Sequence, residues 1–114
     1  MNLFGFLNGG ADLTPEAAAS RIAADSRSVI IDVRSPEEFG EGHVKGALLL
    51  PVDRLDEKIE AAVTDKNTPI FVYCHSGARA AAAVRRLKAD GYTSVFNIGG
   101  VANRGFTKTF PLVR

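Results

Sequence analysis

The residues best suited to chemistry lie in one segment, VYCHSGARAAAA at 72–83. It contains Cys74, the only cysteine of the chain, and Arg79 five positions later. An apolar run precedes the cysteine and an alanine-rich run follows it, so we expect the thiol at the junction of a strand and a helix. A cysteine at such a junction is a candidate nucleophile, because a helix N-terminus favours an anion.

The loop must supply enough free energy to ionise the thiol. A free cysteine is only about 3% thiolate at pH 7, and ionising most of it needs roughly 2.7 kcal/mol of stabilisation. A helix N-terminus contributes about 0.3–1 kcal/mol, whereas each charge-assisted hydrogen bond contributes about 1.5–3 kcal/mol. We therefore predict that backbone N–H groups bind the sulfur and that Arg79 adds a fixed positive charge.

The loop after Cys74 is suited to binding a small anion. Gly77 can take a positive φ and its neighbours are small, so that the N–H groups can converge. His75 either points into the mouth of the site and tunes the thiol, or is a solvated loop residue. Arg34 is a second cation that could add positive potential near the sulfur. The predicted catalytic residue is Cys74, and the predicted substrate-binding residues are His75, Ser76, Gly77, Ala78, Arg79 and Arg34.

Several of these residues also have ordinary structural interpretations. A lone cysteine is more often a small buried hydrophobic residue than a nucleophile, but the junction, the glycine and the arginine favour catalysis here. Two histidines and one cysteine without paired ligand spacing do not predict a metal site, and we expect no cofactor. His43 is interpreted as a structural hydrogen-bonding residue, and Asp32 as an ion-pair partner or loop brace.

The elements that position this loop alternate along the chain. Apolar stretches predict strands at 28–33, 46–51, 69–74 and 93–100. Capping residues, prolines and helical spacing predict helices that begin at Thr14, Ser35, the segment after Asp53 and the segment after the cysteine loop, the last ending at Gly91. This alternation predicts an α/β fold with a mostly parallel sheet and helices on both sides. Ligands of such folds bind at the carboxyl ends of strands, where 32–34, 74–79 and 99–100 are expected.

Size and charge exclude several classes of function. The chain has 114 residues, which suits one domain at 14–114 preceded by an N-terminal arm at 1–13. A formal net charge of +1 does not predict a basic surface for binding nucleic acid. No apolar run is long enough to span a membrane. The apolar arm, MNLFGFL, is expected to pack on the domain, with a dimer contact or a weak membrane anchor as alternatives. A single cysteine cannot form an internal disulfide, so a reducing cytoplasm is the expected compartment.

Three motifs together resemble the rhodanese family. They are IDVRSPEEFGEGHVKGALLLP at 31–51, VYCHSGAR at 72–79 and FNIGG at 96–100. The resemblance runs from about Thr14 to Gly105 and departs from the family after the glycine pair, where VANRGF replaces a segment that usually holds a tryptophan. It implies a single rhodanese-like α/β domain, with a central parallel five-stranded sheet flanked by helices on both faces.

The same resemblance implies sulfurtransferase activity. Cys74 would take a sulfane sulfur from a small anionic donor such as thiosulfate, become a persulfide, and pass the sulfur to cyanide or a thiol. Because the chain has no second cysteine, the acceptor must be external, either a small molecule or a thioredoxin-like or sulfur-acceptor protein. A module that acts by docking or as a sulfur carrier is the alternative. A cysteine-dependent phosphatase is disfavoured, because that class resembles C-x5-R and this loop is one residue shorter. The donor, the acceptor and the oligomeric state stay open.

Overall fold

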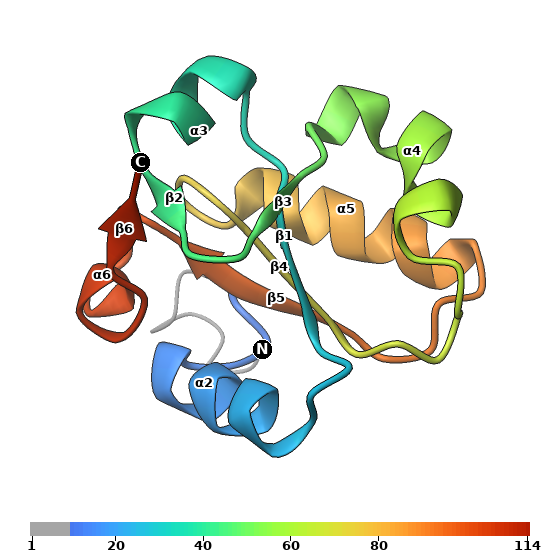
Figure 1. The fold of residues 1–114 in the computed structure, drawn as a ribbon, viewed down its shortest axis with the longest axis horizontal. Coiled ribbons are helices and arrows are strands. Elements are labelled where there is room, and N and C mark those ends of the chain that lie inside the picture. Colours follow the sequence, from blue (N-terminus) through green and yellow to red (C-terminus); the bar gives the residue numbers. More distant parts are fainter. Residues whose placement is uncertain (1–9) are drawn as a thin grey trace.

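The computed structural model describes residues 10–114, and its centre is a parallel sheet of four strands (Figure 1). The strands are β1 (Val29–Asp32), β3 (Leu48–Leu49), β4 (Ile70–Cys74) and β5 (Val95–Gly100), in the spatial order β3-β1-β4-β5. Each lies within a stretch that the sequence predicts as a strand. The expected arm at 1–13, with its apolar residues Phe4, Phe6 and Leu7, lies outside the described residues except for its last four positions.

The prediction of five strands in the central sheet is wrong, because the described residues form four. The edge of β5 is instead covered by residues 12 and 13, whose N–H groups both donate to the carbonyl of Asn97. The N–H of Asn97 is bonded by the carboxylate of Asp12 rather than by a backbone carbonyl, at 2.8 Å. A side chain that replaces the carbonyl ends the ladder, so this segment contacts the sheet without becoming one of its strands.

A second, two-stranded sheet lies apart from the central one. It pairs β2 (His43–Val44) with β6 (Leu112–Val113) in antiparallel fashion. The hydroxyl of Tyr73 on β4 accepts a hydrogen bond from the N–H of Val44 at 2.9 Å. This contact joins the small sheet to β4, the strand that ends at Cys74.

Helices begin where the sequence places caps. Thr14 accepts a hydrogen bond from the N–H of Ala17 at the start of α2 (Pro15–Ala24). Ser35 and Glu38 form a complete capping box at the start of α3 (Pro36–Glu41). The remaining helical segments are the 3-10 turn η1 (Val52–Arg54), α4 (Leu55–Ala62), α5 (Ala78–Ala89) and α6 (Phe106–Thr109). Among the helices described between residues 10 and 114, none has the length and apolar character needed to cross a bilayer.

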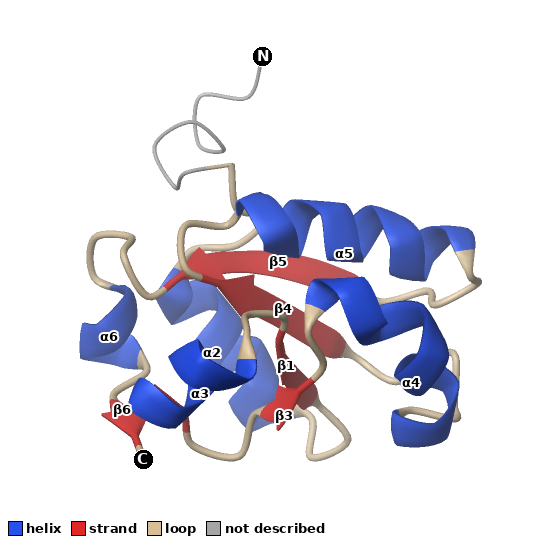
Figure 2. Cartoon of the chain, turned by 90° about the horizontal axis from the view of Figure 1, so that it is seen from above, coloured by secondary structure: helices blue, strands red, loops and turns tan. Residues whose placement is uncertain are grey.

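The sheet separates two apolar clusters, as the alternation of side chains along β4 requires. Ile70, Val72 and Cys74 face the cluster formed with α4 and α5, whereas Phe71 and Tyr73 face the cluster formed with α2 and α6. Figure 2 shows α5 on one side of the strands and α2 and α6 on the other. Helices therefore cover both faces, as predicted, and the carboxyl ends of the strands are left to the connecting loops.

Candidate active site

Cys74 is the last residue of β4, and the loop 75–77 leads from it directly into α5. Its sulfur accepts hydrogen bonds from the N–H of Gly77 at 3.0 Å and from the N–H of Ala80 at 3.4 Å. Gly77 makes the turn possible with a φ of +105°, a conformation that glycine adopts without strain. The structure thus places the thiol beneath the first turn of a helix, with two backbone donors aimed at it.

The sulfur lies deeper than the sequence suggests. Cys74 is 1% exposed and belongs to the apolar cluster between the sheet and α5. His75, Ser76 and Ala78 are exposed, so the loop itself forms the surface above the sulfur. A reagent therefore reaches the sulfur only where the loop admits it.

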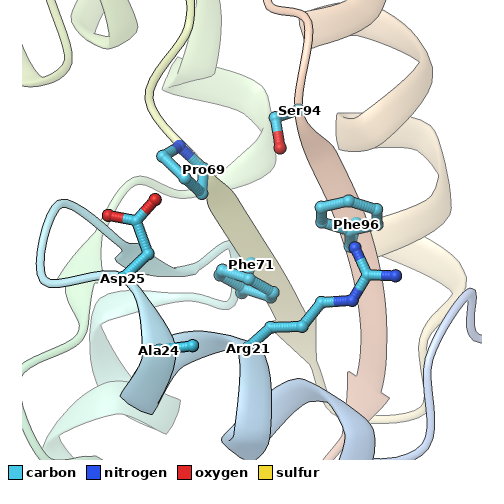
Figure 3. Close-up of a pocket in the computed structure, with 7 residues that line it drawn as sticks. All are labelled: Arg21, Ala24, Asp25, Pro69, Phe71, Ser94 and Phe96. Carbon is cyan, nitrogen blue, oxygen red and sulfur yellow. The ribbon is translucent and has the colours of Figure 1, made fainter.

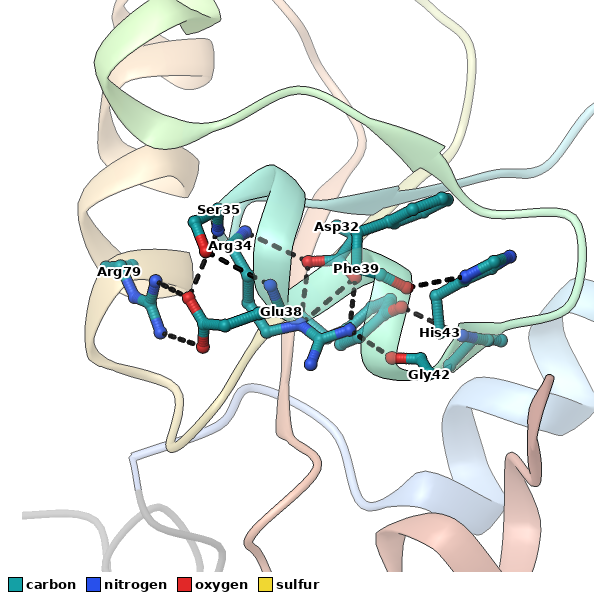
Figure 4. Close-up of polar contacts among 10 residues, drawn as sticks. Asp32, Arg34, Ser35, Glu38, Phe39, Gly42, His43 and Arg79 are labelled. Carbon is teal, nitrogen blue, oxygen red and sulfur yellow. Dashed lines mark hydrogen bonds and ion pairs between the residues drawn. The ribbon is translucent and has the colours of Figure 1, made fainter. Parts of the chain in front are cut away.

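Arg79 does not stand free above the loop. Its guanidinium makes a two-pronged ion pair with Glu38 of α3, with Nη1–Oε1 at 2.8 Å and Nη2–Oε2 at 3.0 Å (Figure 4). The hydrogen bonds from Arg79 lower the pKa of Glu38 to about 2. Sequence reasoning named Arg79 but missed its partner, although Glu38 follows Ser35 at the spacing of a capping box.

Asp32 and Arg34 form a buried pair at the end of β1, which agrees with the structural role expected of Asp32. The carboxylate accepts from the backbone N–H, Nε and Nη2 of Arg34, with an Nη2–Oδ2 distance of 2.7 Å. Nη2 also donates to the carbonyl of Gly42 at 2.7 Å (Figure 4). Within residues 10–114, Nη1 of Arg34 makes no hydrogen bond, and Arg34 lines a cleft beside the cysteine loop.

That cleft borders the loop at His75. It has a volume of about 350 Å³ and is lined by Arg34, Glu38, Glu41, Gly42, His75, Val101 and Leu112. His75 therefore borders the cleft, which leaves its predicted role at the mouth of the site geometrically available. His43 follows Gly42, which lines the cleft, but is not itself a lining residue. Its Nδ1 bonds the carbonyl of Phe39 at 2.9 Å and its ring stacks on that of Phe39.

A second hollow lies at the other end of the sheet and carries no comparable chemistry. It has a volume of about 280 Å³ and includes Pro69 and Ser94, which precede β4 and β5 (Figure 3). The guanidinium of Arg21 lies 4.9 Å from the ring centroid of Phe96 there. Because it contains no cysteine or histidine and lies at the amino ends of the strands, we assign the candidate site to the cysteine loop.

The glycine pair at the end of β5 lets two backbones meet beneath the loop. Gly100 is paired with Cys74 in the sheet, and a Cβ on Gly100 would lie 2.3 Å from the carbonyl carbon and oxygen of His75. Just beyond, the N–H of Val101 donates to the carbonyl of Cys74 at 3.1 Å. The absence of a side chain at Gly100 therefore permits this close approach of β5 to the cysteine loop.

Two asparagine side chains hydrogen-bond to the backbone of the cysteine loop and hold it to the end of β5. The sequence analysis did not identify either of them. Nδ2 of Asn97, a buried side chain on β5, donates to the carbonyl of Gly77 at 3.2 Å. Nδ2 of Asn103 donates to the carbonyl of Ser76 at 3.2 Å, while its Oδ1 accepts from the N–H of Gly100. An asparagine inside an apolar strand was the available signal, because a buried amide needs partners.

Comparisons with known proteins agree with this geometry. A family model described as "Rhodanese-like domain" matches residues 14–103. The thiosulfate sulfurtransferase PspE of Escherichia coli (strain K12) is 41% identical over 78 residues, covering 68% of this chain and 75% of that protein. The putative sulfur carrier protein YrkF of Bacillus subtilis (strain 168) is 30% identical over 87 residues, covering 76% of this chain but 46% of that protein. A solved structure described as "rhodanese with anions from E. coli" is 38% identical, covers 76% of this chain and 98% of that one, and has a TM-score of 0.67.

Proposed function

The chain belongs to the rhodanese-like domain family, and from that premise we propose that it is a sulfurtransferase that carries the transferred sulfur on Cys74. One observation supports this most directly: the sulfur of Cys74 accepts hydrogen bonds from the N–H groups of Gly77 and Ala80 at the start of α5. Donors of this kind favour the thiolate over the thiol and favour a persulfide anion in the same place. An apolar cysteine with a purely structural role has no need of them.

The first half of the reaction loads the sulfur. With thiosulfate as donor, the thiolate attacks the outer sulfur, a sulfur–sulfur bond to Cys74 forms, and sulfite leaves with the electron pair of the broken bond. No proton or external electron is needed, because the total charge of the reactants equals that of the products. The N–H groups around the sulfur then hold the terminal persulfide anion.

The second half passes the sulfur on. Cyanide or a thiolate attacks the terminal sulfur, and Cys74 leaves as the thiolate that began the cycle. The chain holds no second cysteine that could serve as an internal acceptor. We therefore propose an external acceptor, either a small thiol or the cysteine of a partner protein.

Intact-mass measurement tests the proposal directly. After incubation with thiosulfate the wild-type protein should gain the mass of one sulfur atom, and cyanide should remove it with formation of thiocyanate. Cys74→Ser should gain nothing under the same conditions. A wild-type protein that gains no sulfur from thiosulfate, an organic thiosulfonate or 3-mercaptopyruvate would refute the assignment.

A sulfur carrier or docking module is the second candidate, and two observations favour it over an efficient enzyme. Cys74 is 1% exposed, and the guanidinium of Arg79 is occupied by Glu38. A carrier would accept the sulfur once and release it only to a specific partner. Repeated release of sulfite under excess thiosulfate and cyanide supports the enzyme, whereas loading without turnover supports the carrier.

Phosphatase activity is not proposed. The loop keeps four residues between Cys74 and Arg79, one fewer than the phosphatase pattern. Arg79 points to Glu38, so it is not positioned to bind the oxygens of a phosphoryl group. Turnover of an aryl phosphate that is lost in Cys74→Ser would contradict this.

A further inference from the structure

The cation that should attract an anionic donor to Cys74 is already neutralised by Glu38. Arg79 is the second residue of α5, whose first turn donates an N–H to the sulfur. Glu38 reaches the guanidinium of Arg79 from α3 (Figure 4). The two side chains are 37% and 30% exposed, so a solute can reach both charges. A donor that approaches Arg79 therefore meets a full negative charge beside it.

Glu38 is held in place from two directions. Its Oε1 accepts from the backbone N–H of Ser35 at 3.1 Å, and its own N–H donates to the hydroxyl of Ser35 at 3.2 Å. The same Oε1 accepts from Nη1 of Arg79 at 2.8 Å. The hydrogen bonds from Arg79 lower the pKa of Glu38, so its carboxyl is ionised at neutral pH. The negative charge is thus fixed in position by its contacts with Ser35 and Arg79.

The cleft beside the loop adds to this pattern. Glu38 and Glu41 line it together with Arg34 and His75. The buried carboxylate of Asp32 already balances the guanidinium of Arg34. The entrance therefore carries no excess of positive charge, although a doubly charged donor would need one.

We propose that Glu38 is a positioning residue that sets the charge preference of the donor: by holding Arg79 against α3, it disfavours doubly charged donors and makes singly charged sulfane-sulfur donors, such as organic thiosulfonates and persulfides, the favoured class. This inference rests on the proposed sulfurtransferase function. A unit charge about 6 Å from the donor, in a water-like dielectric, changes affinity about threefold for a monoanion and about tenfold for a dianion. The difference between those two factors is the measurable signature.

The test compares two variants on the same helix. Glu38→Gln removes the charge but keeps an oxygen for the N–H of Ser35 and for the guanidinium. Glu37→Gln makes the same change in net charge at an exposed neighbour that makes no hydrogen bond or ion pair within residues 10–114. For each protein, kcat and KM are measured with thiosulfate, a dianion, and with benzenethiosulfonate, a monoanion that transfers its outer sulfur and leaves as the sulfinate.

The proposal expects Glu38→Gln to lower the KM for thiosulfate about tenfold and that for benzenethiosulfonate about threefold, with kcat little changed. Glu37→Gln should shift neither KM by more than about twofold, because exposed charges farther away are screened. Equal shifts with both donors, or the same result from both variants, would overturn the proposal while leaving the function intact. If the wild-type protein takes sulfur from neither donor, the function itself fails.

A measurement on the wild-type protein covers the case in which Glu38→Gln does not fold. Sulfate is a dianion that cannot donate a sulfane sulfur, so it probes binding alone. At equal ionic strength, methanesulfonate, a monoanion, should slow the alkylation of Cys74 by iodoacetamide at a lower concentration than sulfate does, because the charge of Glu38 repels the dianion more strongly. Protection of Cys74 by sulfate at the lower concentration overturns the proposal.

Discussion

Replacing Gly100 by alanine should disrupt the cysteine loop at 74–79 without changing any of its side chains. Gly100 ends β5 and is paired with Cys74. An added Cβ would lie 2.3 Å from the carbonyl carbon and oxygen of His75 and 2.5 Å from the carbonyl oxygen of Cys74. All of these are backbone atoms, so no side-chain rotation relieves the clash. Either β5 or the loop must move.

The size of the effect follows from what that movement breaks. Overpacking of this kind costs about 1–3 kcal/mol. The displaced segments are also joined by two hydrogen bonds, from the N–H of Val101 to Cys74 at 3.1 Å and from the N–H of Ala102 to His75 at 2.8 Å. Each contributes about 1 kcal/mol, so we expect a loss of about 3–5 kcal/mol in the free energy of unfolding. Against a total of about 5–15 kcal/mol, the protein should still fold.

Urea denaturation and sulfur loading measure the two consequences. The variant should unfold at a lower urea concentration, and its Cys74 should load sulfur from thiosulfate more slowly, because the N–H groups no longer converge on the thiol. Gly40→Ala is the matched control, since nothing lies within 4 Å of its added Cβ, and alanine inside a helix should stabilise by about 0.5–1 kcal/mol. A Gly100→Ala protein with wild-type stability and loading rate would show that the close approach does not organise the site.

Three further perturbations test the contacts around the loop. Asn103→Ala removes a bond to the loop carbonyl, so iodoacetamide should alkylate Cys74 several-fold faster; an unchanged rate would count against this fastening. Asp32→Ala leaves the buried guanidinium of Arg34 unpaired and should lower the unfolding free energy by about 3–5 kcal/mol. Asp25→Ala, which breaks an exposed pair, is the control and should lower it by less than about 1 kcal/mol. Equal urea midpoints for the two variants would contradict this. The pKa of Glu38, lowered from 4.5 to about 2, contributes stability that is present above the unfolded pKa and is lost as the pH falls through the folded one. The stability difference between wild type and Glu38→Gln, about 1 kcal/mol after solvent screening, should therefore persist above about pH 5.5 and vanish near pH 2 in urea titrations.

The elements could be predicted because their signals are local. A threonine followed by proline marks the start of α2, and Gly91, with a φ of +98°, follows the end of α5. Ala80, Val84 and Leu87 lie on the buried face of that helix, as their spacing predicts. Each signal involves neighbours within a few positions, so no knowledge of the tertiary structure is required.

The number of strands could not be predicted in the same way. The residues themselves predict four strands, and only the family resemblance implies a fifth. Whether residues 10–13 form a strand depends on which group bonds the N–H of Asn97, and here the carboxylate of Asp12 does so. That contact joins positions separated by 85 residues, and no local pattern encodes it.

The charged contacts of the site could be predicted only in part. The sequence identifies Arg79 as a cation near the sulfur, but it contains 13 acidic residues and does not show which of them meets the guanidinium. The partner lies 41 positions away on α3. The capping box shows only that the carboxylate of Glu38 is fixed at the amino end of its helix; the packing of α3 beside the cysteine loop brings it to Arg79.

The burial of Cys74 sets two requirements of a reactive thiol against each other. The N–H groups of Gly77 and Ala80 converge on the sulfur only when the loop closes over it, so stabilisation of the anion and access to it oppose each other. The side-chain amides of Asn97 and Asn103 fasten the loop to its base through hydrogen bonds rather than apolar packing. Breaking both costs about 1–3 kcal/mol, far less than the cost of opening the apolar core. We therefore expect the loop to open in a small fraction of molecules while the sulfur stays shielded in the rest. A loop held to its base by apolar packing would be expected to open far less often.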